Sequence, residues 1–265
     1  MLDSSGRRIH YLRVSVTDRC NLRCTYCMPE EGVPFLPHEQ ILSFEQIVSV
    51  VRAAADLGFD KVRLTGGEPL VRKGIVDLVS MLAGIDGIAT LGMTTNGTLL
   101  PPLAADLKRR GLSSVNVSLD TLDPGRYAAL TRGGRVHEAI AGVHAARAAG
   151  LPVKLNVVVG TEDDLADLEA LRAFAAETGC QVQTIRRYRL DVDKFDDERF
   201  ERPSPCGGCN RIRLLATGEL KPCLHGDGTV NVDWNDIQGS IRACVELKPA
   251  CGTHASSHLV SAIGG

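Results

Sequence analysis

The chain has few aromatic residues and almost no net charge. Only 4% of its 265 residues are Phe, Trp or Tyr, and the formal net charge at pH 7 is −2. A balance this close to neutral argues against binding of nucleic acid or of an anionic membrane through a broad basic surface. We therefore expect neither nucleic acid nor a membrane as a partner.

Long apolar stretches are also missing. No run approaches the roughly eighteen residues that suggest a membrane-spanning helix. The start of the chain, MLDSSGRRIHYLR, has no apolar segment of the signal-peptide type. These absences predict a cytoplasmic protein, and the sequence leaves open whether it is a monomer or a homodimer.

Cysteine, by contrast, is abundant. The chain has nine cysteines, an odd number, and disulfides are disfavoured in the cytosol. Cys20, Cys24 and Cys27 lie within one short stretch, five more lie between residues 206 and 251, and Cys180 stands alone. Clustered thiols in such a chain indicate metal or redox chemistry.

Short runs rich in Val, Ile and Thr alternate with helical patterns from residue 11 to about residue 190. This alternation predicts an α/β fold with a parallel sheet, a partial (β/α)6 TIM-like barrel. A doubly wound nucleotide fold is disfavoured, because neither G-x-G-x-x-G nor G-x₄-G-K-[ST] occurs. The strand candidates are residues 11–17, 61–66, 88–96, 114–120, 153–159 and 182–189, and the helix candidates are residues 43–58, 75–85, 102–111, 135–150 and 164–179.

The pattern changes after residue 190. LDVDKFDDERFERPSP (190–205) is charged and contains two prolines, as linkers and loops do. It separates a barrel over residues 1–190 from a small C-terminal region over residues 191–265, which contains Cys206, Cys209 and Cys223.

Polar motifs follow four of the predicted strands: TDRC, TGGEP, TTNG and SLD. The carboxyl ends of barrel strands carry the chemistry, so we expect these motifs to gather at one end. In TDRC and the residues after it, the pattern C-x₃-C-x₂-C places three thiols in one loop. Three thiolates fit three irons of a 4Fe–4S cluster and leave the fourth iron open. A zinc-binding interaction module is the alternative outside the enzyme class, and it requires four-ligand sites.

These motifs resemble those of the radical S-adenosylmethionine (SAM) superfamily. The resemblance rests on the three cysteines with Tyr26 before the last of them, and on Gly66, Gly67 and Glu68 in GGEP. It implies a radical SAM type of partial barrel, in which the open iron binds SAM and electron transfer yields a 5′-deoxyadenosyl radical. By itself GGEP is an ordinary β-α turn.

The longer stretches GRRIHYLRVSVTDRCNLRCTYCMP, RLTGGEPL, TTNG and NVSLD, with the final IGG, resemble the GTP 3′,8-cyclase family of molybdenum-cofactor biosynthesis. The resemblance implies GTP as substrate, a lyase activity and a second, auxiliary 4Fe–4S cluster on Cys206, Cys209 and Cys223, whose open iron binds the guanine base. It also implies an electron donor such as flavodoxin or ferredoxin, and a functional link to the next enzyme of the pathway.

The same resemblance assigns roles to individual residues. Thr95, Asn96 and Ser118 match positions near SAM, although such residues also cap turns. Gly264 and Gly265 match a C-terminal pair that reaches the active site, although two terminal glycines also occur in frayed ends. Arg13, Gly264 and Gly265 are the catalytic candidates. The triphosphate clamp implied by the resemblance consists of Arg13, Lys61, Arg63, Lys154, Arg211 and Arg213; basic side chains on strands are alternatively solvated or paired.

The chain departs from the family in two places. In the family, several dozen residues lie between the sixth strand and the auxiliary cysteines, where this chain has only VDKFDDERFERPSP. The family's sixth strand ends in a Glu-Phe-Met-like sequence, which TIRRYRL replaces here, so Arg186 is only a candidate for the family's sixth-strand arginine. A paralogue acting on another nucleotide or on a peptide is therefore the alternative function. Cys244 or Cys251 would close the open iron if either reached the auxiliary cluster; buried or half-exposed free thiols are the alternative. The remaining ligand candidates are His225, His254 and His258.

Overall fold

A computed structural model describes residues 1–187, 200 and 205–252. Most of the predicted linker lies outside these residues, and so do Gly264, Gly265, His254 and His258. No helix in the described part of the chain is long and apolar enough to span a membrane.

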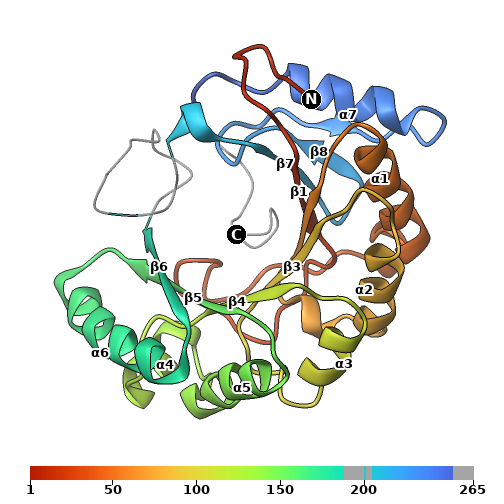
Figure 1. Cartoon of the computed structure of the whole chain (residues 1–265). Coiled ribbons are helices and arrows are strands. Elements are labelled where there is room, and N and C mark those ends of the chain that lie inside the picture. The colour runs from red at the N-terminus through yellow and green to blue at the C-terminus, as the bar shows by residue number, and fades with distance from the viewer. Residues whose placement is uncertain (188–199, 201–204, 253–265) are drawn as a thin grey trace.

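The predicted parallel sheet is confirmed. Its first six strands lie side by side in chain order and curve into an open barrel (Figure 1). Each strand pairs in parallel with the next strand. The first and last residues of each strand lie within three residues of the ends of its predicted range. The strands are β1 (Tyr11–Ser15), β2 (Lys61–Thr65), β3 (Thr90–Thr95), β4 (Ser114–Ser118), β5 (Val153–Val159) and β6 (Gln181–Arg186).

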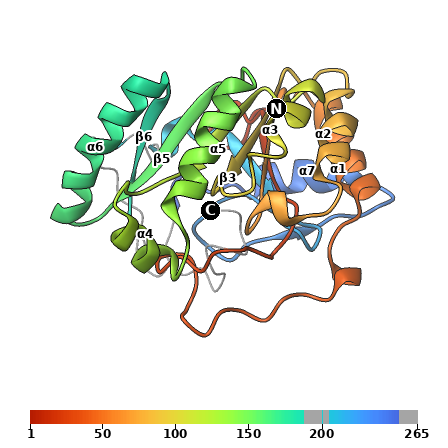
Figure 2. The ribbon, with the colours of Figure 1, turned by 90° about the horizontal axis from the view of Figure 1, so that it is seen from below.

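The helices between these strands cover the outer face of the sheet (Figures 1 and 2). In α1, Ser43 and Gln46 form the predicted capping box, and Gly58 follows the C-cap with a φ of 84°. One helix between β4 and β5, α4, was not predicted. The helices are α1 (Phe44–Asp56), α2 (Ile75–Ala83), α3 (Ala104–Arg109), α4 (Pro124–Thr131), α5 (Val136–Ala148) and α6 (Glu162–Thr178).

The C-terminal region continues the same sheet beyond β1. β7 (Arg211–Leu214) pairs in parallel with β1, and β8 (Glu219–Lys221) and β9 (Val230–Asn231) then add antiparallel strands. The helix α7 (Ile237–Glu246) packs against α1. The sheet order is therefore β6-β5-β4-β3-β2-β1-β7-β8-β9, and β1 lies inside the sheet.

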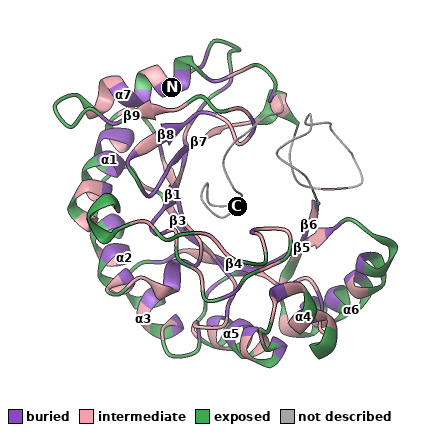
Figure 3. Cartoon of the chain, turned by 180° about the vertical axis from the view of Figure 1, so that it is seen from behind, coloured by how far each residue is buried: buried purple, intermediate pink, exposed green. Residues whose placement is uncertain are grey.

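The hydrophobic core lies between the sheet and its helices (Figure 3). Leu12 and Val14 on β1, and Val62 and Leu64 on β2, are fully buried there. Side chains alternate between the two faces of a strand. The intervening residues therefore face the inside of the barrel, and in this chain they are mostly polar.

Candidate active site

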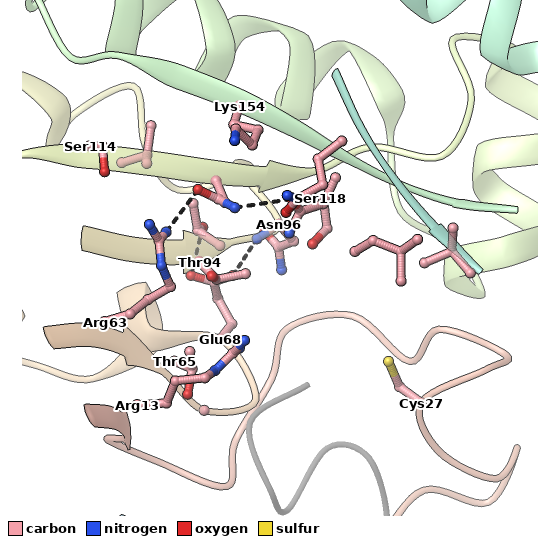
Figure 4. Close-up of a pocket in the computed structure, with 18 of the residues that line it drawn as sticks. Arg13, Cys27, Arg63, Thr65, Glu68, Thr94, Asn96, Ser114, Ser118 and Lys154 are labelled. Carbon is pink, nitrogen blue, oxygen red and sulfur yellow. Dashed lines mark hydrogen bonds between the residues drawn. The ribbon is translucent and has the colours of Figure 1, made fainter. Parts of the chain in front are cut away.

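The inside of the barrel is a cavity of about 600 Å³. This volume lies within the range of small-molecule and cofactor sites. Figure 4 shows strand side chains directed into it, with Cys27 facing them from its loop. Among the described residues that line the cavity, Glu68 is the only carboxylate. The basic lining residues are Arg13, Lys61, Arg63, Arg147, Lys154, Arg186, Arg187, Arg211 and Arg213.

Strand register arranges the central cations in two rows across β2, β1 and β7. In the first row Tyr11 is paired with Lys61 on one side and with Arg211 on the other. In the second row Arg13 is paired with Arg63 and with Arg213. The parallel pairing of β1 with β7 thus brings Arg211 and Arg213 of CNRIRL beside Arg13 and Arg63 of the first two strands. All six residues of the predicted clamp line this cavity.

Tyr11 is a buried member of this cluster that sequence reasoning missed. Its hydroxyl accepts a hydrogen bond from Nε of Arg63 at 2.9 Å. Lys61 Nζ lies 4.9 Å and Arg211 Cζ 5.9 Å from the centre of its ring, within the range of cation–π contacts. Burial raises the pKa of Tyr11, but Arg13, Arg63, Arg211 and Lys61 together lower it below its usual value. The alternating pattern of YLRVS could have predicted this, because it places Tyr11 on the same face of the strand as Arg13.

Arg63 is held by several protein acceptors. Besides Tyr11, its Nη1 donates to the carbonyl of Met93 at 2.9 Å and to Oδ1 of Asn116 at 2.8 Å. Gly92 provides the space for it, because a Cβ there would lie 2.7 Å from Nη2 of Arg63. Arg63 therefore also braces the cavity wall.

The neighbouring cations change the pKa of Arg13. Burial lowers its pKa, and the positive charges of Arg213, Arg211 and Arg63 lower it further, while Tyr11 acts in the opposite direction. A guanidinium nevertheless stays charged at neutral pH. A group of cations held this close together is electrostatically suited to a ligand with several negative charges.

The opposite wall, on β4 and β5, consists of polar and aliphatic residues, with Lys154 as its charged member. Asn116 Nδ2 donates to Oδ1 of Asn156 at 3.0 Å, which extends the network of Arg63 across both strands. Ser118 ends β4 and lines the cavity, as does Arg186 at the end of β6.

The loop with Cys20, Cys24 and Cys27 follows β1 and is attached to the C-terminal end of α4. The amides of Arg23 and Thr25 donate to the carbonyls of Thr131 and Leu130. Within the loop, the amide of Cys27 donates to the carbonyl of Cys24 at 2.9 Å. All three cysteines line the cavity.

Arg132 also fixes this loop through hydrogen bonds to its backbone. Its Nη1 donates to the carbonyls of Arg23, Met28 and Pro29 at 2.9, 2.9 and 3.3 Å. Arg132 has a φ of 55°, the only positive value at a non-glycine residue in the described part of the chain. This left-handed backbone at the end of α4 directs the side chain toward the loop. Sequence reasoning missed this residue.

Gly66 and Gly67 allow the GGEP turn to pack directly against the cysteine loop. The amide of Gly67 donates to the carbonyl of Thr17 at 2.9 Å, and that of Glu68 to the carbonyl of Arg19 at 2.8 Å. A Cβ on Gly66 would lie 2.5 Å from the oxygen of Thr17, and one on Gly67 would lie 2.3 Å from the oxygen of Arg19. Both contacts are with backbone atoms, so larger residues cannot fit.

The carboxylate of Glu68 joins the GGEP turn to TTNG, and Asn96 continues the connection to the cysteine loop. Oε1 accepts from the hydroxyl of Thr95 at 2.8 Å and from the amide of Leu70 at 2.9 Å, and Oε2 accepts from the amide of Asn96 at 2.6 Å. Asn96 in turn donates to Oδ1 of Asn21 in the cysteine loop at 2.8 Å. Burial raises the pKa of Glu68 to about 7, against the lowering effect of these hydrogen bonds.

Tyr26, the aromatic residue before the last cysteine, is oriented by Asp120 of the SLD motif. The Tyr26 hydroxyl donates to Oδ2 of Asp120 at 2.5 Å, while Oδ1 accepts from the amide of Val158 at 2.7 Å. Burial raises the pKa of Asp120 to about 6. Sequence reasoning singled out Ser118 in this motif and missed Asp120.

The N-terminal cysteine loop fits a cluster with an open iron. It places three cysteine thiols beside the cavity, and three thiolates are the protein ligands of a 4Fe–4S cluster with one open iron. Among described residues, no group of three or more His, Cys, Asp or Glu side chains could hold one metal ion. A zinc site requires such a group around one ion, whereas a cluster spreads its ligands over four irons.

The C-terminal cysteines lie next to the row of arginines, because only Asn210 separates Cys209 from the start of β7. Burial raises the pKa of Cys209, but Lys248, the amide of Arg211 and the charge of Arg211 lower it below its usual value overall. This favours the thiolate, the form that binds iron. Sγ of Cys251 lies 3.4 Å from Sγ of Cys206, whereas Cys244 is fully buried in α7.

Comparisons with known proteins show the family of the chain. A family model described as the radical SAM superfamily matches residues 14–175. A GTP 3′,8-cyclase from Thermodesulfovibrio yellowstonii is 38% identical over an alignment that covers all of both chains. One from Heliobacterium modesticaldum is 44% identical over 85% of this chain and 84% of that protein. One from Moorella thermoacetica is 41% identical over 94% of each.

Solved structures share the fold at much lower sequence identity. Streptococcus suis SuiB bound to S-adenosylmethionine has a TM-score of 0.67 and 16% identity, over 87% of this chain and 64% of that one. Methylornithine synthase has a TM-score of 0.57 and 16% identity, over 90% of this chain and 82% of that one. The sequence relatives, at 38–44% identity, decide the family, whereas the solved structures show only the fold. The chain belongs to the GTP 3′,8-cyclase family of the radical SAM superfamily.

Proposed function

We propose that the chain converts GTP to 3′,8-cyclo-7,8-dihydro-GTP, the first step of molybdenum-cofactor biosynthesis, and that it does so as a lyase. The observation that carries the proposal is the pair of cation rows on β2, β1 and β7, which lie between two sets of cysteines. The cofactors of this family are SAM and 4Fe–4S clusters. When bound, they supply a radical that removes a hydrogen atom from the ribose.

The cation rows hold the triphosphate in this proposal. Arg13 and Arg213 provide two neighbouring guanidinium groups, and arginine binds phosphate oxygens in a fixed, bidentate geometry. Lys61 and Arg211 flank Tyr11 in the adjacent row, and Lys154 approaches from the opposite wall. Arg63 contributes mainly by bracing Tyr11 and Asn116, because its Nε and Nη1 already donate to protein acceptors.

The ends of β2, β3 and β4 hold SAM. Glu68 fixes the backbone of Asn96 and the side chain of Thr95, so that both motifs keep one position relative to the cysteine loop. Tyr26 is fixed in the same way by Asp120. Holding the cofactor and the substrate in fixed positions is the main catalytic contribution of these residues.

The alternative substrate is another nucleotide or a peptide, and one observation favours it. The alignment with the T. yellowstonii cyclase has 324 positions, 59 more than the 265 residues of this chain, although it covers all of both proteins. The chain therefore lacks at least 59 positions of that alignment. A shorter chain has fewer residues to enclose the substrate.

The test is an anaerobic turnover experiment. The chain is reconstituted with iron and sulfide, reduced with flavodoxin or ferredoxin as the electron donor, and given SAM with GTP. Mass spectrometry then follows 5′-deoxyadenosine and the nucleotides. We expect a cyclised species with the mass of GTP, formed in step with 5′-deoxyadenosine.

One control reaction and one outcome of the main experiment separate the proposal from its alternative. ATP in place of GTP should give no cyclised product. If 5′-deoxyadenosine forms while GTP stays unchanged, the radical SAM chemistry holds but GTP is not the substrate. The search then moves to other nucleotides and to peptides.

A further inference from the structure

A fourth cysteine lies at the C-terminal cysteine set. Cys206 and Cys251 are 45 residues apart in sequence, yet their Sγ atoms are 3.4 Å apart and do not form a disulfide. The amide of Gly252 also donates to Sγ of Cys206 at 3.4 Å. A Cβ on Gly252 would lie 3.3 Å from Sγ of Cys223. The segment that follows α7 thus reaches two of the three predicted ligands, Cys206 and Cys223.

Arg7 holds this segment in place from the start of the chain. Its Nη1 donates to the carbonyls of Cys206 and Ala250 at 2.8 and 3.0 Å, and its Nη2 donates to the carbonyl of Pro249 at 2.7 Å. Asp3 orients the guanidinium by accepting from Nε at 2.7 Å. One buried cation therefore connects the backbone at Cys206 to the residue that precedes Cys251.

Lys248 makes a second connection to the same segment. The side chain is buried, and Nζ donates to the carbonyl of Arg211 at 2.8 Å and to that of Pro222 at 2.7 Å. Arg211 follows Cys209 by two residues, and Pro222 directly precedes Cys223. Two buried cations, Arg7 and Lys248, thus link residues 248–250 to the neighbours of all three predicted ligands.

We propose that Cys251 supplies a fourth thiolate to the C-terminal 4Fe–4S cluster in the substrate-free protein. The inference depends on the proposed function, because it requires that Cys206, Cys209 and Cys223 bind a cluster. Thiolate is the ligand that such clusters take, and four cysteines are a complete set. Cys251 is exposed, but its position is fixed by its neighbours.

The inference changes how GTP would meet the cluster. With four thiolates no iron is open, and the guanine base reaches iron only by displacing a ligand. Cys251 is the ligand to be displaced, since it lies at the exposed end of the set, whereas Cys206, Cys209 and Cys223 are half-buried. Removing its thiol should therefore make the iron easier for GTP to reach.

The first test measures thiol reactivity instead of activity. The cluster-loaded full chain is reduced with a phosphine, desalted without oxygen and treated with N-ethylmaleimide, and a chelator-stripped sample is treated in the same way. Peptide mass spectrometry should find Cys251 labelled about tenfold or more slowly in the loaded protein, because only a free thiolate reacts. Cys180 is the matched control, with equal rates in both samples. Equal rates for Cys251 would overturn the inference.

The second test uses the variant with Cys20, Cys24 and Cys27 replaced by Ala, which keeps only the C-terminal set. Its cluster signal in electron paramagnetic resonance is titrated with GTP, with and without Cys251→Ala. Half of the spectral change should occur at about a tenfold lower GTP concentration without Cys251, because no thiolate has to be displaced. Identical titrations would contradict the inference, and so would the same tenfold effect from His225→Ala with Cys251 intact.

Failure of the proposed function would look different. If the triple variant binds no iron, there is no C-terminal cluster, and both proposals fall. If it binds iron while Cys251 is labelled equally fast in the loaded and stripped full chain, only the fourth-ligand inference falls.

Discussion

Arg13 and Arg213 are paired in register on the neighbouring parallel strands β1 and β7, although they lie 200 positions apart in sequence. Both side chains face the barrel cavity, and Arg213 lowers the pKa of Arg13 after burial has already lowered it. Like charges this close repel each other, and an anion bound beside them lowers that repulsion.

Arg213→Ala tests this pair. The variant should lose about 1–3 kcal/mol of GTP binding free energy, roughly five- to 150-fold in dissociation constant, because a charge-assisted contact to phosphate is removed. Equilibrium binding of GTP measures the loss. Cleavage of SAM without GTP should continue at the wild-type rate, since the cysteine loop is unchanged. Arg242→Ala, at an exposed position of α7, is the control. Unchanged GTP affinity in Arg213→Ala would show that the clamp assignment is wrong.

Gly67→Ala should remove the SAM cluster and leave the C-terminal cluster in place. The added Cβ would lie 2.3 Å from the backbone oxygen of Arg19 and push the cysteine loop away. Iron and sulfide analysis should find the content of one cluster only, and SAM binding should be lost. Gly228→Ala is the control, because a Cβ there meets nothing within 4 Å. Retention of two clusters in Gly67→Ala would rule out this packing.

Arg132→Ala and Arg132→Gly separate the side chain of Arg132 from its backbone strain. Both variants lose the contacts to the three loop carbonyls, so a chelator should extract the SAM-site iron faster from both than from the wild type. Only Gly relieves the left-handed backbone, which costs about 1 kcal/mol or more in other residues. The Gly variant should therefore melt at a higher temperature than the Ala variant. Extraction at the wild-type rate would mean that Arg132 does not brace the loop.

Glu68 should make the protein less stable as the pH rises. Its pKa is about 7 in the folded chain against 4.5 for a free glutamic acid, so the folded state holds a proton that the unfolded state releases. Between about pH 4.5 and pH 7 its contribution to the unfolding free energy should fall by about 3 kcal/mol and then stay constant. Urea unfolding of wild type and Glu68→Gln measures it, because other titrating groups cancel in the difference. A difference that is flat across this window would contradict the raised pKa.

Local patterns in the sequence were sufficient to predict the barrel and the part of the site around the cysteine loop. Alternating Val, Ile and Thr located all six strands from β1 to β6, because a strand buried against helices needs this pattern. The capping box at Ser43 located the start of α1. The motifs TDRC, TGGEP and TTNG come together as expected, because parallel strands place their carboxyl ends at one edge of the sheet.

Long-range relationships were not visible in the sequence. The strand RIRL of β7 is four residues long, and its pairing with β1 spans 200 positions, so no local period indicates it. The contacts of Arg7 and Lys248 with backbone carbonyls have no sequence pattern, because any residue offers a carbonyl. The position of Cys251 beside Cys206 depends on these contacts, so only the structure could reveal it.

The central position of β1 has a consequence for how the chain is made. β1 is complete near the start of synthesis, but its second neighbour, β7, appears only after residue 210. At about 5–20 residues per second, translation leaves one edge of β1 without its partner for roughly ten seconds or more. An uncovered strand edge invites pairing with other chains. Co-translational protection of residues 11–15, by a chaperone or by the emerging barrel, would therefore govern the yield of folded protein.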